Sequence, residues 1–437
     1  MKNFINNYFK LKESNTSISI ELLAGFTTFI SMSTIIFLNP TVLSEAGMDK
    51  YALITGTCLA SAFASLLMGL YANYPIGLAS TMGVNSFFAL VVVNQMGLTW
   101  QQGLTAVFIV GILFVIITAT KIRELIMYSI PYTINMSITV GIGIFLITIG
   151  LQQAEIILTD YSTFFKFGEL STPSSILVLF GFILILTFSY YKIKGAILLS
   201  IIAVTIASIP LGVTTAPTSF ISTPPSIAPI FFKFDFSEFF NLNFIMAVVT
   251  LLFLAIFDTV GTLIAIATRA NLLDKNGNMV RSRKAFMSDA IGSVGGAIFG
   301  VSTVGSYLES ITGIESGGRT GLTAVFIALF FILAMFFSPL IAIVPAAAIA
   351  PALIFIGLLM MTLIKNINYK DITELVPSLL GIIMIPLSGD IAVGIEYAIL
   401  SYLILKLLTG QFKKISNTIY VLSAIFIIKR IFEFFNF

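Results

Sequence analysis

The sequence predicts an all-α, multi-pass membrane protein with fourteen transmembrane segments, arranged as two inverted repeats of seven. Three observations support this prediction. The chain is 58% hydrophobic and only 10% charged, whereas soluble domains carry about 25% charged residues. Apolar runs of about 20 residues, the length that crosses a bilayer as a helix, recur along the chain. The stretch "GLTAVFI" occurs at 103–109 and again at 321–327. The alternative, a soluble helical protein, would have to bury far too much apolar surface.

The apolar runs define the individual segments. The predicted membrane segments are 19–39, 52–72, 75–93, 101–120, 124–151, 174–191, 195–213, 243–268, 285–301, 302–315, 320–338, 343–364, 372–387 and 390–408. The third and the tenth are short and interrupted by Gly, Ser and Thr. A further apolar stretch, 419–435, contains Lys429 and Arg430, and we expect it to be interfacial or only partly inserted.

The distribution of positive charge predicts the orientation. With the N-terminus in the cytoplasm, almost every assigned Lys and Arg falls in a cytoplasmic loop, and only Lys50, Lys166 and Lys233 fall outside. The first residues, "MKNFINNYFKLKESNTS", lack the apolar core of a secretory signal. We therefore expect a cell-membrane protein, in the plasma or inner membrane. The net charge of +3 suggests no nucleic-acid partner, and the single cysteine, Cys58, excludes a disulfide framework.

Other pairs repeat at nearly the same spacing as "GLTAVFI". "STMG" at 80–83 returns as "STVG" at 302–305, and Pro131 in "SIPYTI" corresponds to Pro345 in "IVPAAA". A unit of seven segments is odd, so the second copy enters the membrane in the opposite orientation. Inverted repeats of this kind are typical of secondary transporters, whose substrate sites lie near the bilayer midplane at broken segments.

The broken segments are "GLASTMGVNSFFA" (77–89) and "GVSTVGSYLESITG" (300–313). Backbone outside a helix is tolerated at membrane depth only where it is buried or lines a cavity. The helix that follows each break presents free N–H groups and a partial positive charge. We therefore predict that the two segments together form a polar site.

Ionisable residues deep in the membrane are functional candidates by default. Asp258 lies in the middle of the eighth segment, and Glu309 follows the break in the tenth. A purely structural alternative for Asp258 is hydrogen bonding to Thr259 or Thr262. We interpret Asp289 and Glu396 as residues with structural roles. The chain has no His, so a proton carrier in the membrane would be a carboxylate, and no metal-ligand cluster or phosphate-binding loop is present.

Asn85, just after the first break, carries an amide with donors and acceptors. Its alternative role is a hydrogen bond between packed helices.

Several long motifs resemble the AzgA-like branch of the nucleobase permeases, which move adenine, guanine and hypoxanthine. These motifs are "FDTVGTLIAIATRANLLDKNGN", "STVGSYLESITGIESGGRTGLTAVF", "STMGVNSFFA" and "ELLAGFTTFISMSTIIFLNPTVLSEAGMD". The resemblance implies a core domain that carries substrate against a gate domain. The core would comprise 1–120 and 241–340, the gate would comprise 121–240 and 341–410, and 411–437 would form an apolar tail.

The resemblance also implies proton-coupled purine uptake and a set of site residues. Asn85, Asp258 and Glu309 would bind the base. We also predict Thr259, Gly305 and Ser306 as substrate-binding residues. Asp258 and Glu309 would also couple transport to protons. Ala255 departs from the family, because members often carry an Asp there, one turn before Asp258.

Several alternatives stay open. A uracil or xanthine permease on the same fold would also use paired carboxylates, and an ion channel is a second possibility. Two carboxylates argue against an anion permease, and a membrane hydrolase lacks a catalytic constellation. We expect no cofactor and no enzymatic activity. The sequence leaves open the preferred purine, H⁺ or Na⁺ coupling, and whether the chain forms a homodimer.

Overall fold

The computed structural model describes residues 2–120, 131–160, 164–217, 219–270, 272, 279, 281–389 and 391–434. Backbone contacts divide the chain into two compact units. The first unit comprises Met1–Thr120 and Ala154–Ala352, and the second comprises Lys121–Gln153 and Leu353–Phe437. The predicted core and gate domains are defined by which parts move, so that division stays a prediction.

The first half of unit one is helical except at one break. Its elements are α1 (Lys2–Phe9), α2 (Ile18–Met32), α3 (Ile35–Ser44), α4 (Lys50–Leu67) with its π-helical end η1 (Met68–Ala72), β1 (Leu78–Ser80), α5 (Met82–Ser86), the π-helix η2 (Phe87–Gln95) and α6 (Trp100–Ala119). Polar side chains start the long helices. Asp49 caps α4 by accepting from the Ala52 amide, and Thr99 forms a capping box with Gln102 at the start of α6.

The second half of unit one repeats this order. It contains α11 (Leu242–Arg269), α12 (Ser282–Ile298), β4 (Val304–Ser306), α13 (Ser310–Glu315), α14 (Gly321–Ala334), the 3₁₀ turn η3 (Met335–Phe337) and α15 (Ser338–Ala342). The residues between the halves form a β-hairpin and two helices, namely β2 (Ile157–Asp160), β3 (Phe164–Phe167), α9 (Pro173–Tyr190) and α10 (Ala196–Ser208).

Unit two is helical throughout its described part. It contains α8 (Tyr132–Gln153), most of α16 (Ala346–Met361), η4 (Thr362–Asn366), α17 (Ile372–Ser388), α18 (Ile391–Leu408), η5 (Phe412–Lys414) and α19 (Asn417–Phe434). The fully buried Lys406 side chain on α18 lies 3.2 Å from Oδ2 of Asp371 at the start of α17. The Thr373 hydroxyl and this ammonium group lower the pKa of Asp371 to about 2. The predicted tail segment is the helix α19, and whether it crosses a membrane stays a prediction.

The helices of the structure confirm the prediction of a multi-span membrane protein. Among the described residues, seven helices are long and apolar enough to cross a bilayer, and five further apolar helices are shorter. The first predicted segment differs from the structure, because the helix is interrupted at Ser33 and Thr34 and continues as α3. The third and tenth segments are broken as expected, each by a three-residue strand followed by a helix.

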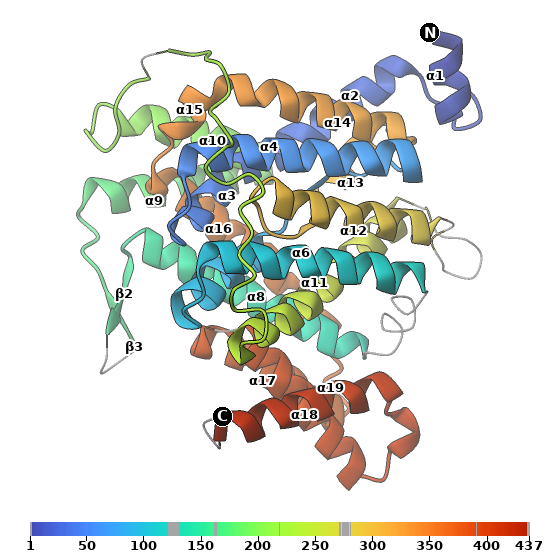
Figure 1. Cartoon of the computed structure of the whole chain (residues 1–437). Helices are drawn as coiled ribbons and strands as arrows, with labels where there is room; N and C mark the ends of the chain where they lie inside the picture. The colour runs from blue at the N-terminus through green and yellow to red at the C-terminus, as the bar shows by residue number, and fades with distance from the viewer. Residues whose placement is uncertain are drawn as a thin grey trace. The chain divides into compact units, whose positions relative to one another are not determined.

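Four long helices of unit one are packed in the order α14, α4, α12 and α6 (Figure 1). They come alternately from the two halves of unit one, since α4 and α6 belong to the first half and α12 and α14 belong to the second. The β1–β4 pair adjoins this layer, because β1 contacts α4 and β4 contacts α12. The two halves are therefore interleaved rather than side by side.

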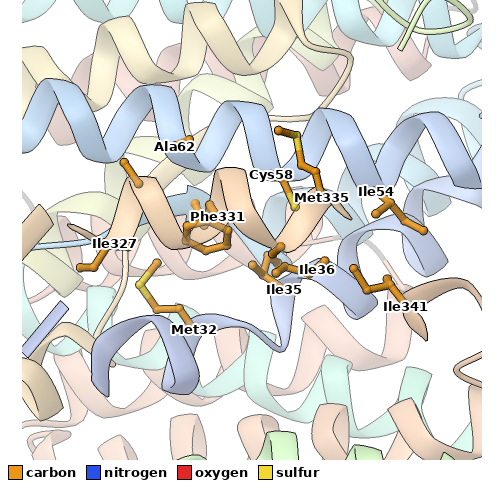
Figure 2. Close-up of a cluster of buried hydrophobic side chains, with 13 residues drawn as sticks. Met32, Ile35, Ile36, Ile54, Cys58, Ala62, Ile327, Phe331, Met335 and Ile341 are labelled. Carbon is orange, nitrogen blue, oxygen red and sulfur yellow. The ribbon is translucent and has the colours of Figure 1, made fainter. Parts of the chain in front are cut away.

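A hydrophobic cluster lies where α2, α3, α4 and the end of α14 meet (Figure 2). Met32, Cys58 and Phe331 are fully buried at its centre. Met82 and Tyr307, which belong to the two broken segments, pack against this cluster. The apolar core thus supports the broken segments directly.

Candidate functional site

The two broken segments meet as a short antiparallel pair. β1 and β4 pair with Leu78 opposite Ser306, Ala79 opposite Gly305, and Ser80 opposite Val304. All six residues are buried. An isolated two-stranded pair is only marginally stable, so this one depends on bonds from its surroundings.

A serine on the preceding helix holds each strand. Oγ of Ser65 on α4 accepts from the Leu78 amide at 3.0 Å and donates to the Leu78 carbonyl at 3.1 Å. Oγ of Ser293 on α12 accepts from the Val304 amide at 3.1 Å and donates to the Val304 carbonyl at 3.0 Å. Both halves therefore satisfy their extended backbone in the same way, as a low-dielectric environment requires.

Residues that correspond in the two sequence repeats also meet in space. The Ser80 and Ser302 hydroxyls are 3.2 Å apart, and the Thr81 and Thr303 hydroxyls are 3.3 Å apart. The Thr81 amide also donates to the Thr303 carbonyl at 3.1 Å. Each pair is separated by 222 residues, which is the spacing between "STMG" and "STVG".

Asp258 and Thr259 on α11 lie beside Gly305 of β4. A methyl group at Gly305 would lie 3.4 Å from Oδ2 of Asp258, 3.6 Å from Oγ1 of Thr259 and 2.6 Å from Cγ2 of Thr81. Three predicted site residues are therefore brought together at a position so closely packed that a side chain on residue 305 would collide with Thr81. Ala255, one turn earlier on the same helix, is buried.

Glu309 occupies the N-cap position of α13, but its side chain makes no capping bond. Tyr307, two residues earlier, is within electrostatic range of the carboxyl groups of both Glu309 and Asp258. The Tyr307 hydroxyl donates to the Ser80 carbonyl at 2.5 Å. The two predicted carboxylates thus lie near one tyrosine that bridges the broken segments.

Ser306, the last residue of β4, is 2% exposed. Its hydroxyl has no hydrogen-bond partner among the residues that the structure describes. Buried polar groups in native proteins nearly always have a partner, so this hydroxyl is suited to bind a ligand. No group of three His, Cys, Asp or Glu that could hold a metal occurs within the described ranges.

The side-chain amide of Asn85 on α5, unlike the Ser306 hydroxyl, is hydrogen-bonded to other side chains of the protein. Its Oδ1 accepts hydrogen bonds from the hydroxyls of Ser80, at 2.9 Å, and Ser302. Its Nδ2 donates to Oδ1 of Asn39 at 2.6 Å. Asn85 lies at the strand crossing with the other predicted residues, but its direct contact with substrate stays a prediction.

Sequence reasoning missed Asn39, Thr81 and the hydroxyl group of Tyr307 in this region. Asn39 did carry a signal, because an amide inside the apolar run "IIFLNPTV" must find a partner when it is buried. Thr81 and Tyr307 carried little signal, since hydroxyl and aromatic residues are common in this chain. Only the pairing of the strands shows that they lie at the site.

The sequence pattern of the Permease family (Xan_ur_permease) matches residues 19–396. The chain belongs to this family. The resemblance to the AzgA-like nucleobase permeases is confirmed, and the protein is a membrane transporter rather than an enzyme.

Several permeases are similar over nearly the whole chain. The permease MJ0326 of Methanocaldococcus jannaschii is 43% identical over 98% of both chains. The adenine permease AdeP of Escherichia coli is 38% identical over 98% of this chain and 96% of its own. The guanine/hypoxanthine permease PbuO of Bacillus subtilis is 36% identical over 96% of this chain and 99% of its own.

Solved structures show the same fold at low sequence identity. The transmembrane domain of the cyanobacterial bicarbonate transporter BicA matches with a TM-score of 0.66 at 18% identity, covering 87% of this permease and 97% of that domain. SLC26A9 matches with a TM-score of 0.60 at 11% identity, covering 93% of this permease and 69% of that chain. The permease therefore has the fold of these membrane transporters.

Proposed function

We propose that this permease imports purine nucleobases, namely hypoxanthine, guanine and adenine, across the cell membrane. The observation that carries the proposal is the grouping of Asp258, Thr259 and Gly305 at the crossing of the broken segments. The adenine permease AdeP and the guanine/hypoxanthine permease PbuO, both similar over full length, support this substrate class.

The chemistry of the site suits a flat, neutral base with N–H donors and ring-nitrogen acceptors. A carboxylate accepts two parallel N–H bonds. Asp258 and Glu309 would accept from the base, and the Ser306 and Thr259 hydroxyls would donate to or accept from it. The absence of a side chain at Gly305 would let the ring approach the backbone closely.

Proton symport is the coupling that we propose, with Asp258 and Glu309 as the groups that exchange protons. Both are carboxyl groups, and the chain has no His to take that role. Asp258 is also within electrostatic range of Asp289 on α12. A like charge nearby disfavours the charged form of a carboxyl group, which suits Asp258 to take up a proton.

An elevator-like movement of a core domain against a gate domain is the proposed mechanism, on fourteen spans in two inverted repeats. The packing order α14, α4, α12 and α6 supports the repeat. In the repeat, α4 corresponds to α12 and α6 corresponds to α14, and exchanging these helices leaves every pair of neighbours the same. The equivalent Ser65 and Ser293 bonds support it as well. The proposed orientation has a cytoplasmic N-terminus, and a homodimer is consistent with the proposal.

The test uses purified protein and a panel of adenine, guanine, hypoxanthine, xanthine and uracil at two pH values. We expect purine binding, and uptake into proteoliposomes that follows an imposed proton gradient with or without Na⁺. Asp258→Asn and Glu309→Gln should each reduce uptake by at least about tenfold, which corresponds to about 1.4 kcal/mol. Wild-type hypoxanthine uptake by both variants would refute the site. Selective binding of uracil or xanthine would refute the substrate class.

A further inference from the structure

A single chain of buried hydrogen bonds connects helix α4 to both broken segments. Thr57 on α4 donates from Oγ1 to the Leu53 carbonyl at 2.6 Å, and accepts from Nδ2 of Asn39 at 2.7 Å. Oδ1 of Asn39 accepts from Nδ2 of Asn85 at 2.6 Å. Asn85 in turn holds one serine from each broken segment, as described above. The side chains of Thr57, Asn39 and Asn85 are all fully buried.

The direction of these hydrogen bonds follows from which atoms can donate and which can accept. The single hydroxyl proton of Thr57 is bonded to the Leu53 carbonyl, so Thr57 can only accept from Asn39. The nitrogen of Asn39 therefore points to Thr57 and its oxygen to Asn85. Asn85 must then present its nitrogen to Asn39 and its oxygen to the two serines. Each amide orientation is thus fixed by the next group, from α4 to the strand crossing.

The amide of Asn85 is already bonded within this network. Its oxygen accepts from two hydroxyls and its nitrogen donates to Asn39. Among the described residues, the buried hydroxyls of Ser86 and Ser306, one in each broken segment, have no partner. Asn85 is therefore better suited to hold the strands than to bind a ligand.

We propose that Asn39 and Asn85 act together as positioning residues that hold the two strands in register, rather than as ligands of the base. Asn85 then affects affinity through the position of β4, which carries Gly305 and Ser306. This inference rests on the proposed purine transport and assigns a role to Asn39.

The test compares purine affinities of Asn39→Ala, Asn85→Ala, the double variant and Thr57→Val with the wild type. We expect each change to weaken adenine, guanine and hypoxanthine binding by a similar factor, about ten- to a hundredfold, because a buried polar group loses its partner. The affinity ratio between adenine and hypoxanthine should stay within about twofold of the wild type. The double variant should be no weaker than Asn85→Ala alone, because the residues act in one chain.

Two matched variants of α4 serve as controls. Thr57→Ser keeps the hydroxyl and should retain wild-type affinity. Thr55→Val removes a hydroxyl two residues away that bonds to the Pro225 carbonyl outside the network, and should also bind as the wild type does. Thr57→Val preserves side-chain size and leaves both amides in place, so it provides the measurement if Asn39→Ala does not fold.

Three results would overturn the inference. One is a change of about tenfold or more in the adenine-to-hypoxanthine ratio for Asn85→Ala alone, which would make Asn85 a direct ligand. Another is wild-type affinity in Thr57→Val, and the third is additive losses in the double variant. A wild-type protein that binds no purine would instead refute the proposed function, so the two failures are distinguishable.

Discussion

Gly305 shows how one residue can determine how closely the site is packed. Any side chain there would meet Thr81, Asp258 and Thr259, which come from α11 and from the first broken segment. The glycine is required by this close approach, since β4 is ordinary extended backbone. The width of the site is therefore set where the two strands pair.

Gly305→Ala should weaken purine binding without unfolding the protein when Thr81→Ser is also present. The added methyl would lie 2.6 Å from Cγ2 of Thr81, and serine lacks that carbon atom, so the double variant relieves the clash while the methyl still fills the site. We expect affinity at least about tenfold below that of Thr81→Ser alone, a difference of about 1.4 kcal/mol. Equal purine affinities in equilibrium binding would show that the space does not hold the ligand.

At the scale of elements, the three-residue strands owe their stability to their neighbours. Ser65 and Ser293 each bond both the amide and the carbonyl of one strand residue. Helix α14 also packs very closely on η1, because a methyl group at Gly321 would lie 2.0 Å from the Gly69 carbonyl oxygen. The second copy of the "GLTAVFI" stretch thus begins at a close contact between helices.

Ser65→Ala should destabilise the permease, and Ser293→Ala should do so to a similar extent. Each leaves two buried backbone groups without partners, at about 1–3 kcal/mol per group. Ser61→Ala is the matched control on α4, because its hydroxyl donates only to the Thr57 carbonyl one turn earlier. Thermal unfolding in detergent should show lower midpoints for the first two variants only. A Ser61→Ala midpoint as low as that of Ser65→Ala would contradict this account.

At the scale of the whole molecule, the two halves stabilise each other through acidic residues. Glu21 on α2 accepts from the amides of Arg319 and Thr323 at 3.0 and 3.1 Å, at the start of α14. Asp235, just before α11, makes a similar contact at the start of α6, where its carboxylate accepts from Nε2 of Gln102 at 3.3 Å. Glu21 and Asp235 are 214 residues apart, which is also the spacing of Pro131 and Pro345.

The two acidic contacts should differ in strength. Glu21 is fully buried and its carboxylate also accepts from the Thr323 hydroxyl, so Glu21→Gln places an amide nitrogen among donors and should cost about 2–3 kcal/mol. Asp235 is partly exposed, and Asp235→Asn should change stability much less, because solvent screens it. Melting temperatures of the two variants give the comparison, and a larger loss for Asp235→Asn would contradict the predicted order.

The sequence by itself determined the class of protein, the broken segments and the acidic candidates. Apolar runs cannot be hidden in a soluble fold, and ionisable groups such as Asp258 and Glu309 are too costly in a membrane to occur without a role. The repeat spacing also indicated that Ser80 and Ser302 correspond. These conclusions depend only on local composition and on order along the chain.

The tertiary structure alone decided which groups share the site. Asn39 and Asn85 are 46 residues apart, and only the packing of α3 beside α5 turns them into one hydrogen-bonded network. The close packing at Gly305 likewise arises from the pairing of β1 with β4 beside α11. Hydrogen bonds and contacts depend on distances of a few ångströms between distant segments, which the order of residues along the chain does not specify.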